Sequence, residues 1–216
     1  ELDPDIRSLR QTVLYGLKGI SAYGHQAREL GYYSDQVDDF YIQALEAITD
    51  DRLTVEELIR LTMRTGEMAI EVMKKLDDAN TERYGNPSLH KVNVRMKKGP
   101  FIVVSGHDLK DLEMLLEQTK GMGISIYTHG EMLPSHGYDG LKKYPHLVGN
   151  FGGAWQDQQK EFDHLPGAIL MTTNCLMRPR DSYKDRIFST NVVGWEGVTF
   201  IPKDENGWKD FGPVIE

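Results

Sequence analysis

The sequence has one cysteine, Cys175, among its 216 residues. A single cysteine excludes an internal disulfide and a complete four-cysteine metal site, and it is typical of a reducing compartment. We therefore expect a cytoplasmic protein. The sequence also lacks the run of about 20 apolar residues that a membrane-spanning helix requires, so we expect no membrane partner.

Positive charge is scarce as well. The chain has 25 Lys and Arg against 33 Asp and Glu, which gives a formal net charge of -8. Binding to nucleic-acid phosphates needs clustered Lys and Arg, so we expect no nucleic-acid partner. With 39% hydrophobic and 27% charged residues, the composition is that of an ordinary globular protein. The chain begins with Glu1 and has no leader pattern, and we expect a piece of a longer protein.

The first part of the sequence predicts three helices. Apolar residues recur at steps of three and four from Pro4 to about Leu30, and proline suits a first helical turn. Ser34 is placed to cap a second helix, and Thr54 with Glu57 forms a capping box ahead of a third. Short connections between three helices indicate a small antiparallel bundle, which we assign to residues 1–96.

The remaining residues, 97–216, predict a Rossmann-like parallel α/β domain with helices on both faces, because short apolar runs alternate with amphipathic segments. We expect this domain to be truncated at its C-terminus, since residues 203–216 show little periodicity. The expected strands lie at 101–104, 124–128, 146–148, 168–172, 192–194 and 198–202, and the expected helices at 108–120, 133–144 and 154–162.

Three loops that follow predicted strands carry metal-ligand side chains, namely His107, Glu131 and Cys175. The carboxyl ends of parallel strands meet at one edge of a sheet, so we expect the three to converge. Nitrogen, oxygen and sulfur donors together suit iron, zinc or nickel better than magnesium or calcium. Gly106 and Gly130 precede two of these residues and would let the backbone approach a bulky ligand closely.

Each member of this trio also has an ordinary structural interpretation. His107 could be a cap, Glu131 a first-turn carboxylate favoured by a helix dipole, and Cys175 an inert buried thiol. The three residues match no compact metal-binding template. A nucleophilic pair of Cys175 and His107 is a further alternative, although no protease signature accompanies it.

Other polar and aromatic residues give weaker signals. The glycines at 149, 152 and 153 could cradle an anion, but they do not fit the dinucleotide fingerprint, so close packing is favoured. We expect most of the histidines at 136, 146 and 164 to lie at the surface, in helices or at their ends, and the tryptophans at 155, 195 and 208 to be packing anchors. The basic stretch from Lys91 to Lys98 reads as a solvated linker.

Five sequence words at the predicted loops carry a family resemblance. They resemble the hybrid cluster protein family, also called prismane proteins or hydroxylamine reductases, and the opening Asp5-Ile-Arg-Ser-Leu is similar to its second helical bundle. The words are Val104-Ser-Gly-His-Asp-Leu-Lys-Asp-Leu, Tyr127-Thr-His-Gly-Glu-Met-Leu-Pro, His146-Leu-Val-Gly-Asn, Ala154-Trp-Gln-Asp-Gln-Gln-Lys-Glu-Phe and Met171-Thr-Thr-Asn-Cys-Leu.

The resemblance implies a redox metalloenzyme. His107, Glu131 and Cys175 would be ligands of the hybrid cluster, an assembly of four irons bridged by sulfide and oxygen. The family reduces hydroxylamine to ammonia and water, and nitric oxide reduction is also ascribed to it. Electrons would come from a redox partner protein through a second, conventional iron-sulfur cluster, whose N-terminal four-cysteine motif is missing here.

The resemblance also implies that this chain holds only part of the site. The family's other hybrid-cluster ligands, three cysteines and a glutamate, lie C-terminal to the region that matches, so we expect the chain alone to lack activity and to need the remaining parts of the parent chain. Next to the ligands, His129, Thr173 and Asn174 would form supporting hydrogen bonds.

Two alternatives stay open. The chain could be a fragment of the related nickel and iron carbon monoxide dehydrogenases, although the Thr-His-Gly-Glu and Thr-Thr-Asn-Cys words favour the hybrid cluster proteins. It could also be a stand-alone α/β binding module in which the three residues are structural.

Overall fold

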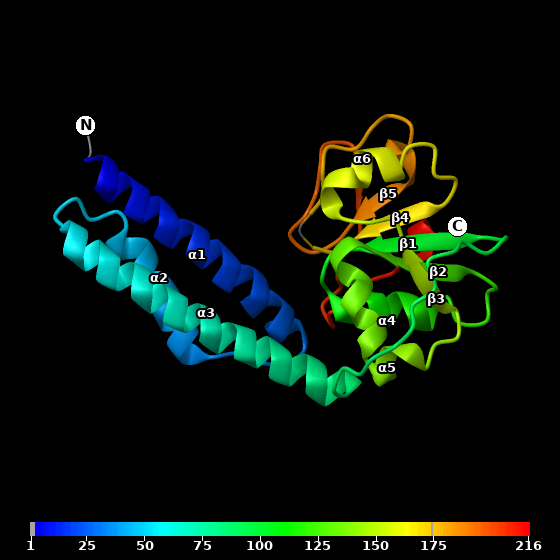
Figure 1. Cartoon of the computed structure of the whole chain (residues 1–216), viewed down its shortest axis with the longest axis horizontal. Coiled ribbons are helices and arrows are strands. Elements are labelled where there is room, and N and C mark those ends of the chain that lie inside the picture. Colours follow the sequence, from blue (N-terminus) through cyan, green and yellow to red (C-terminus); the bar gives the residue numbers. More distant parts are fainter. Residues whose placement is uncertain (1–2, 174) are drawn as a thin grey trace. The chain divides into compact units, whose positions relative to one another are not determined.

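The computed structural model describes residues 3–173 and 175–216 of the chain (Figure 1). The chain divides into two compact units, Glu1–Arg83 and Tyr84–Glu216. Residues 85–100 contain no helix or strand. The domain boundary that we place after residue 96 stays a prediction.

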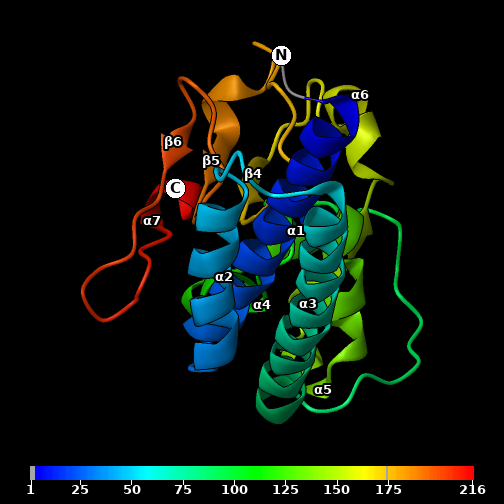
Figure 2. The same ribbon diagram turned by 90° about the vertical axis from the view of Figure 1, so that its left-hand side faces the viewer.

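Three helices form the first unit, as the sequence predicts. They are α1 (Pro4–Glu29), α2 (Asp35–Ala47) and α3 (Val55–Tyr84), and they lie side by side in Figures 1 and 2. The capping box is present, because the Thr54 amide donates to Glu57 Oε2 at 2.8 Å and the Glu57 amide donates to Thr54 Oγ1 at 3.3 Å. Ser34 occupies the N-cap of α2, but its side chain makes no capping hydrogen bond. The buried core contains Val13, Leu17, Ile20, Val37, Phe40, Ala44, Met68 and Val72.

The second unit is built on a six-stranded parallel sheet in the order β3-β2-β1-β4-β5-β6. The strand order reverses between β1 and β4, and ligands of open α/β sheets bind at the carboxyl end of such a switch point. This arrangement confirms the Rossmann-like prediction. The strands are β1 (Phe101–Ser105), β2 (Ser125–His129), β3 (Leu147–Phe151), β4 (Ala168–Met171), β5 (Ile187–Ser189) and β6 (Thr199–Phe200).

Both faces of this sheet are covered. On one face, Val103, Tyr127 and Ile169 pack with Phe162, which follows α6. Their strand neighbours Ile102 and Ile126 point to the other face and are also buried, as a sheet between two helical layers requires. The helices are α4 (Leu109–Gln118), η1 (Gly130–Gly137), α5 (Asp139–Lys142), η2 (Trp155–Asp157), α6 (Gln158–Glu161), η3 (Lys184–Arg186) and α7 (Gly212–Ile215).

Two of the expected elements are wrong. The single helix predicted over 133–144 is a 3-10 helix, η1, followed by the short α5, because Pro134 lacks an amide proton and Tyr138 has an extended backbone. The strand predicted over 192–194 does not form. The sheet instead contains β5, which the sequence analysis missed, and Asn191 turns the chain away with a φ of 57°.

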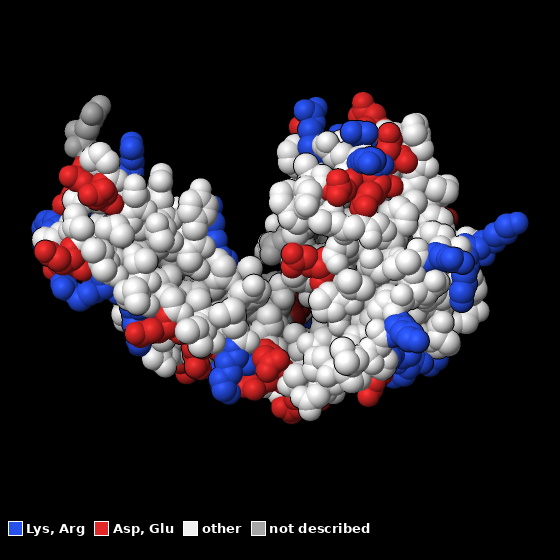
Figure 3. Space-filling model, in the orientation of Figure 1, with Lys and Arg blue, Asp and Glu red and all other residues white. Residues whose placement is uncertain are grey.

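The surface differs from expectation at the tryptophans. Trp155, Trp195 and Trp208 are 46%, 45% and 47% exposed, so the prediction that they are packing anchors is wrong. In Figure 3, several Lys and Arg side chains gather on the right-hand side of the second unit with few acidic neighbours, whereas basic and acidic side chains lie close together elsewhere on the face shown. No helix within the described residues is long and apolar enough to cross a membrane.

The segment expected as a solvated linker is largely exposed, yet two of its residues are tied to the sheet. The Asn93 carbonyl accepts a hydrogen bond of 2.8 Å from the Asn150 amide in β3. The Lys97 amide donates to the Tyr127 hydroxyl at 2.8 Å. These contacts fix the segment along its sheet without burying its charged side chains.

Candidate metal centre

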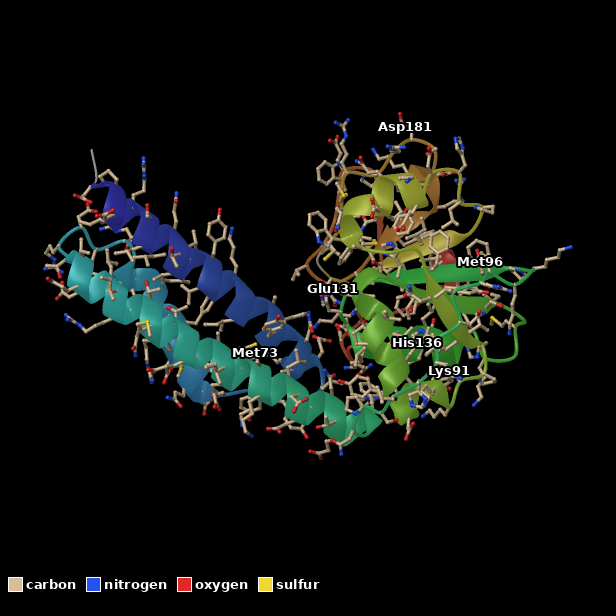
Figure 4. The ribbon with its side chains drawn as sticks, viewed as in Figure 1. Met73, Lys91, Met96, Glu131, His136 and Asp181 are labelled. Atoms are coloured by element: carbon tan, nitrogen blue, oxygen red, sulfur yellow. The ribbon has the colours of Figure 1, made fainter. Side chains whose placement is uncertain are left out.

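The three predicted ligands follow strands that end at the same level. In the sheet, Ser105 pairs with His129 on one side and with Met171 on the other. His107, Glu131 and Cys175 come within four residues of these strand ends, and Glu131 is labelled in Figure 4. The strand register therefore brings the three loops to one edge, as the sequence predicts for parallel strands.

His107 and Glu131 contact each other directly. His107 Nε2 lies 3.0 Å from Glu131 Oε2, and the exposed fractions of the two side chains are 23% and 62%. The second ring nitrogen of His107, Nδ1, is buried and has no hydrogen-bond partner within the described part of the chain. An imidazole nitrogen without a partner and an accessible carboxylate are groups that a metal ion can use.

Cys175 is a half-buried free thiol. Burial raises its pKa, and the negative charge of Glu131 raises the pKa further. A raised pKa disfavours the thiolate, which is the nucleophilic form, and this counts against the nucleophile alternative. Coordination to a metal ion deprotonates a thiol, so the raised pKa is compatible with a role of Cys175 as a metal ligand.

These residues do not form a complete metal site by themselves. Among the described residues, no group of three His, Cys, Asp or Glu side chains has an arrangement that could hold a metal ion. The structure joins His107 to Glu131 and places the Cys175 loop at the same edge. The assignment of all three as ligands stays a prediction.

Two hydroxyls from the loop after β4 support the His107 loop. The His107 amide donates to Thr173 Oγ1 at 3.0 Å, and the Asp108 amide donates to Thr172 Oγ1 at 3.2 Å. Gly106 has a φ of 110°, and an added Cβ would lie 2.5 Å from Thr172 Oγ1. The absence of a Cβ at Gly106 therefore permits close contact with the loop after β4, and the expected close approach of a ligand at Gly106 and Gly130 stays a prediction.

Both ring nitrogens of His129 have side-chain partners outside the proposed ligand trio. Its Nδ1 lies 2.9 Å from Ser105 Oγ and its Nε2 lies 2.9 Å from Glu161 Oε2. Burial lowers the pKa of His129, and the Glu161 carboxylate partly offsets this effect. Neither ring nitrogen of His129 is therefore hydrogen-bonded to Glu131. The third expected supporting residue, Asn174, lies outside the described residues.

The glycines in and after β3 pack against protein atoms. A Cβ on Gly149 would lie 2.1 Å from the Asn93 carbonyl oxygen, and one on Gly152 would lie 2.5 Å from a Glu161 carboxylate oxygen. The Gly153 amide donates to the other Glu161 oxygen at 2.8 Å. The turn after β3 therefore holds an internal carboxylate, which supports the packing interpretation over an external anion.

We expect most of the histidines at 136, 146 and 164 at the surface, but of these three only His164 is exposed. His136, which is labelled in Figure 4, is 7% exposed, and its Nε2 lies 2.9 Å from Thr128 Oγ1. His146 is partly buried and contacts Thr119 Oγ1 at 3.1 Å. The surface prediction is wrong for both, because tertiary partners pair these rings inside the unit.

Sequence reasoning did not identify Gln158, which begins α6. Its side chain is fully buried and bonds the backbone of the Cys175 loop at two points. In the sequence, Gln158 is one of several polar residues in the word Ala154-Trp-Gln-Asp-Gln-Gln-Lys-Glu-Phe. That word alone does not reveal that the Gln158 side chain bonds the Cys175 loop.

The chain is similar to known proteins over nearly its whole length. The sequence matches the Prismane/CO dehydrogenase family over residues 1–216. It is 55% identical over 214 residues to the hydroxylamine reductase of Caldanaerobacter subterraneus subsp. tengcongensis and 55% identical over 215 residues to that of Kosmotoga olearia. Each alignment covers 99% of this chain and 39% of the relative, so the chain spans about two fifths of the length of these curated relatives.

Proposed function

Since the chain belongs to the Prismane/CO dehydrogenase family, we propose that it is the central part of an iron-sulfur oxidoreductase that reduces hydroxylamine to ammonia and water. The observation that carries this proposal is the 55% identity to a protein named hydroxylamine reductase over 99% of the chain. The relatives are longer than the match, and we propose that the chain alone is inactive.

Three residues would hold part of the hybrid iron-sulfur-oxygen cluster. His107 would supply a ring nitrogen, Glu131 a carboxylate oxygen and Cys175 a thiolate. Mixed nitrogen, oxygen and sulfur donors suit iron. The buried His107 Nδ1, which has no partner among the described residues, and the exposed Glu131 carboxylate support this assignment. Because these side chains make no complete site, the remaining ligands would come from other parts of the longer protein.

Reduction of hydroxylamine consumes two electrons and two protons and breaks the N-O bond. Ordinary side chains do not carry redox electrons, so the bound cluster would supply the electron transfer. The chain would contribute by holding its ligands. Thr173 fixes the backbone at His107, and the His107 ring fixes one Glu131 oxygen.

The partners follow from the same proposal. Hydroxylamine would be the small-molecule substrate, with nitric oxide as a further candidate. A redox partner protein would deliver electrons through a conventional iron-sulfur cluster held outside this chain.

The substitution Glu131→Gln in the full-length protein tests the proposal. The amide is the same size as the carboxylate but is a poorer iron ligand. We expect changed visible and EPR spectra and reduced hydroxylamine turnover, with a melting temperature close to that of the unmodified protein. Glu205→Gln, at an exposed turn, is the matched control and should change neither property.

The same preparations separate the alternatives. A full-length protein without iron would favour a stand-alone binding module. Nickel together with iron, and oxidation of carbon monoxide, would favour a carbon monoxide dehydrogenase. Unchanged spectra and turnover in the Glu131→Gln protein would contradict the ligand role of Glu131.

A further inference from the structure

The Gln158 side chain uses both ends of its amide on one loop. Its Nε2 donates to the Cys175 carbonyl oxygen, and its Oε1 accepts a hydrogen bond of 3.0 Å from the Met177 amide. Gln158 is 0% exposed. A buried amide is costly unless its polar atoms are paired, and here two partners come from the loop that carries the thiol.

The backbone of Cys175 has an unusual conformation. Its φ is 55°, in the left-handed region that residues with a Cβ seldom adopt. Such a conformation persists only where surrounding contacts fix it. The two hydrogen bonds from Gln158 hold the peptide groups at Cys175 and Met177, and thereby restrain the direction of the Cys175 Cα-Cβ bond.

We propose that Gln158 is a positioning residue for Cys175, which keeps the thiol at the edge of the sheet where His107 and Glu131 meet. The part of this inference that concerns metal binding by Cys175 rests on the proposed function. The restraint of the Cys175 loop by Gln158 does not depend on that function. Gln158 itself has no contact with the metal in this proposal, since both of its amide atoms are bonded to backbone.

A second glutamine offers a matched control in the same unit. Gln118 Nε2 donates to the Lys209 carbonyl oxygen at 2.8 Å, and Gln118 Oε1 accepts from the Phe211 amide at 2.8 Å. This side chain makes the same two-point contact with a different loop. Substitution of Gln118 therefore shows the effect of losing such a two-point contact elsewhere, and substitution of Gln158 shows the effect of losing it at Cys175.

The test uses the single cysteine of the chain. Selective labelling with ¹³C,¹⁵N-cysteine gives one amide signal and one Cβ signal, both from Cys175. We expect Gln158→Met to move both signals or split them into several, because the left-handed conformation loses its restraint. Gln118→Met should leave them in place, and circular dichroism checks that each variant is folded.

A second substitution guards against a variant that does not fold. Gln158→Glu keeps the size and the acceptor for the Met177 amide, but its carboxylate cannot donate to the Cys175 carbonyl. We expect it to move the Cys175 signals as well. Unmoved signals in a folded Gln158→Met or Gln158→Glu chain would overturn the inference.

This outcome is independent of the iron experiments. If Gln158→Met moves the signals while Cys175→Ser leaves the iron content and spectra of the full-length protein unchanged, the ligand role fails and the positioning role stands. If Cys175 is needed for iron but the signals do not respond to Gln158, only the positioning role fails.

Discussion

The backbone amide of His107 donates a hydrogen bond of 3.0 Å to the hydroxyl of Thr173, which lies 66 residues further along the chain. Thr173 is 3% exposed, so this contact is largely shielded from water. It ties the loop after β1 to the loop after β4. Two of the three proposed ligands are carried by these loops, and their spacing depends on this contact.

Replacement of Thr173 by valine should loosen the His107 loop. Valine keeps the shape but removes the acceptor, and an unsatisfied buried amide costs about 1–3 kcal/mol. We expect faster hydrogen exchange at the His107 amide and a lower urea midpoint. Thr173→Ser retains the hydroxyl and should restore slow exchange. Thr119→Val, at the buried hydroxyl of the residue that follows α4, should leave hydrogen exchange at His107 unchanged. The same effect in this variant would show that the contact between His107 and Thr173 is unimportant.

Gly106 should not tolerate a side chain. Its φ of 110° is unfavourable for any residue with a Cβ, and that atom would lie 2.6 Å from the Thr173 carbonyl oxygen. We expect Gly106→Ala to lower the free energy of unfolding by about 1–3 kcal/mol or more, from strain and overlap together. Chemical denaturation measures this loss. Gly121→Ala, where φ is 78° and the added atom meets nothing within 4 Å, separates strain from overlap, and equal losses would argue against the overlap.

The buried ion pair between Lys209 and Asp111 should be costly to break. Their side chains are 2% and 1% exposed, and Lys209 Nζ also contacts Asn191 Oδ1 at 2.7 Å. Removing one partner of a buried pair leaves an uncompensated charge and costs about 3–5 kcal/mol. We expect such a loss for Lys209→Met in urea unfolding. Lys74→Met, which breaks the exposed pair with Asp78, should change stability little.

The stability of the second unit should fall at mildly acidic pH because of His136. Burial lowers its pKa in the folded state, so the unfolded chain binds the proton more readily. The folded state is therefore favoured above the ordinary histidine pKa, near 6.5, and loses stability as the pH falls below that value. Urea midpoints at pH 8 and pH 5 measure this loss. His136→Gln should reduce the difference, and an unchanged difference would exclude His136 as its source.

Local signals in the sequence predicted local structure well. The capping box of Thr54 and Glu57 involves residues three apart, and β1 and β2 come from short apolar runs, so both follow from neighbouring residues. The strand β5 was missed because it has only three residues, and its pairing comes from β4 and β6.

The remaining differences between the predictions and the structure come from contacts between residues that are distant in the sequence. His136 is buried because its ring meets Thr128 in β2, and no helical period encodes that contact. Gln158 reaches Cys175 and Met177, which are 17 and 19 residues away. Parallel topology predicted that the proposed ligands share an edge, but the hydrogen bonds that hold their loops required the folded structure.

Pulsed EPR of the full-length protein labelled with ¹⁵N-histidine tests most directly whether His107 is an iron ligand. We expect a ¹⁵N coupling to the cluster that disappears in His107→Gln and persists in His146→Gln, because His146 precedes β3 at the end of that strand opposite to the proposed ligands. A ¹⁵N coupling that survives in His107→Gln, with the cluster spectrum unchanged, would contradict the assignment of His107 as an iron ligand.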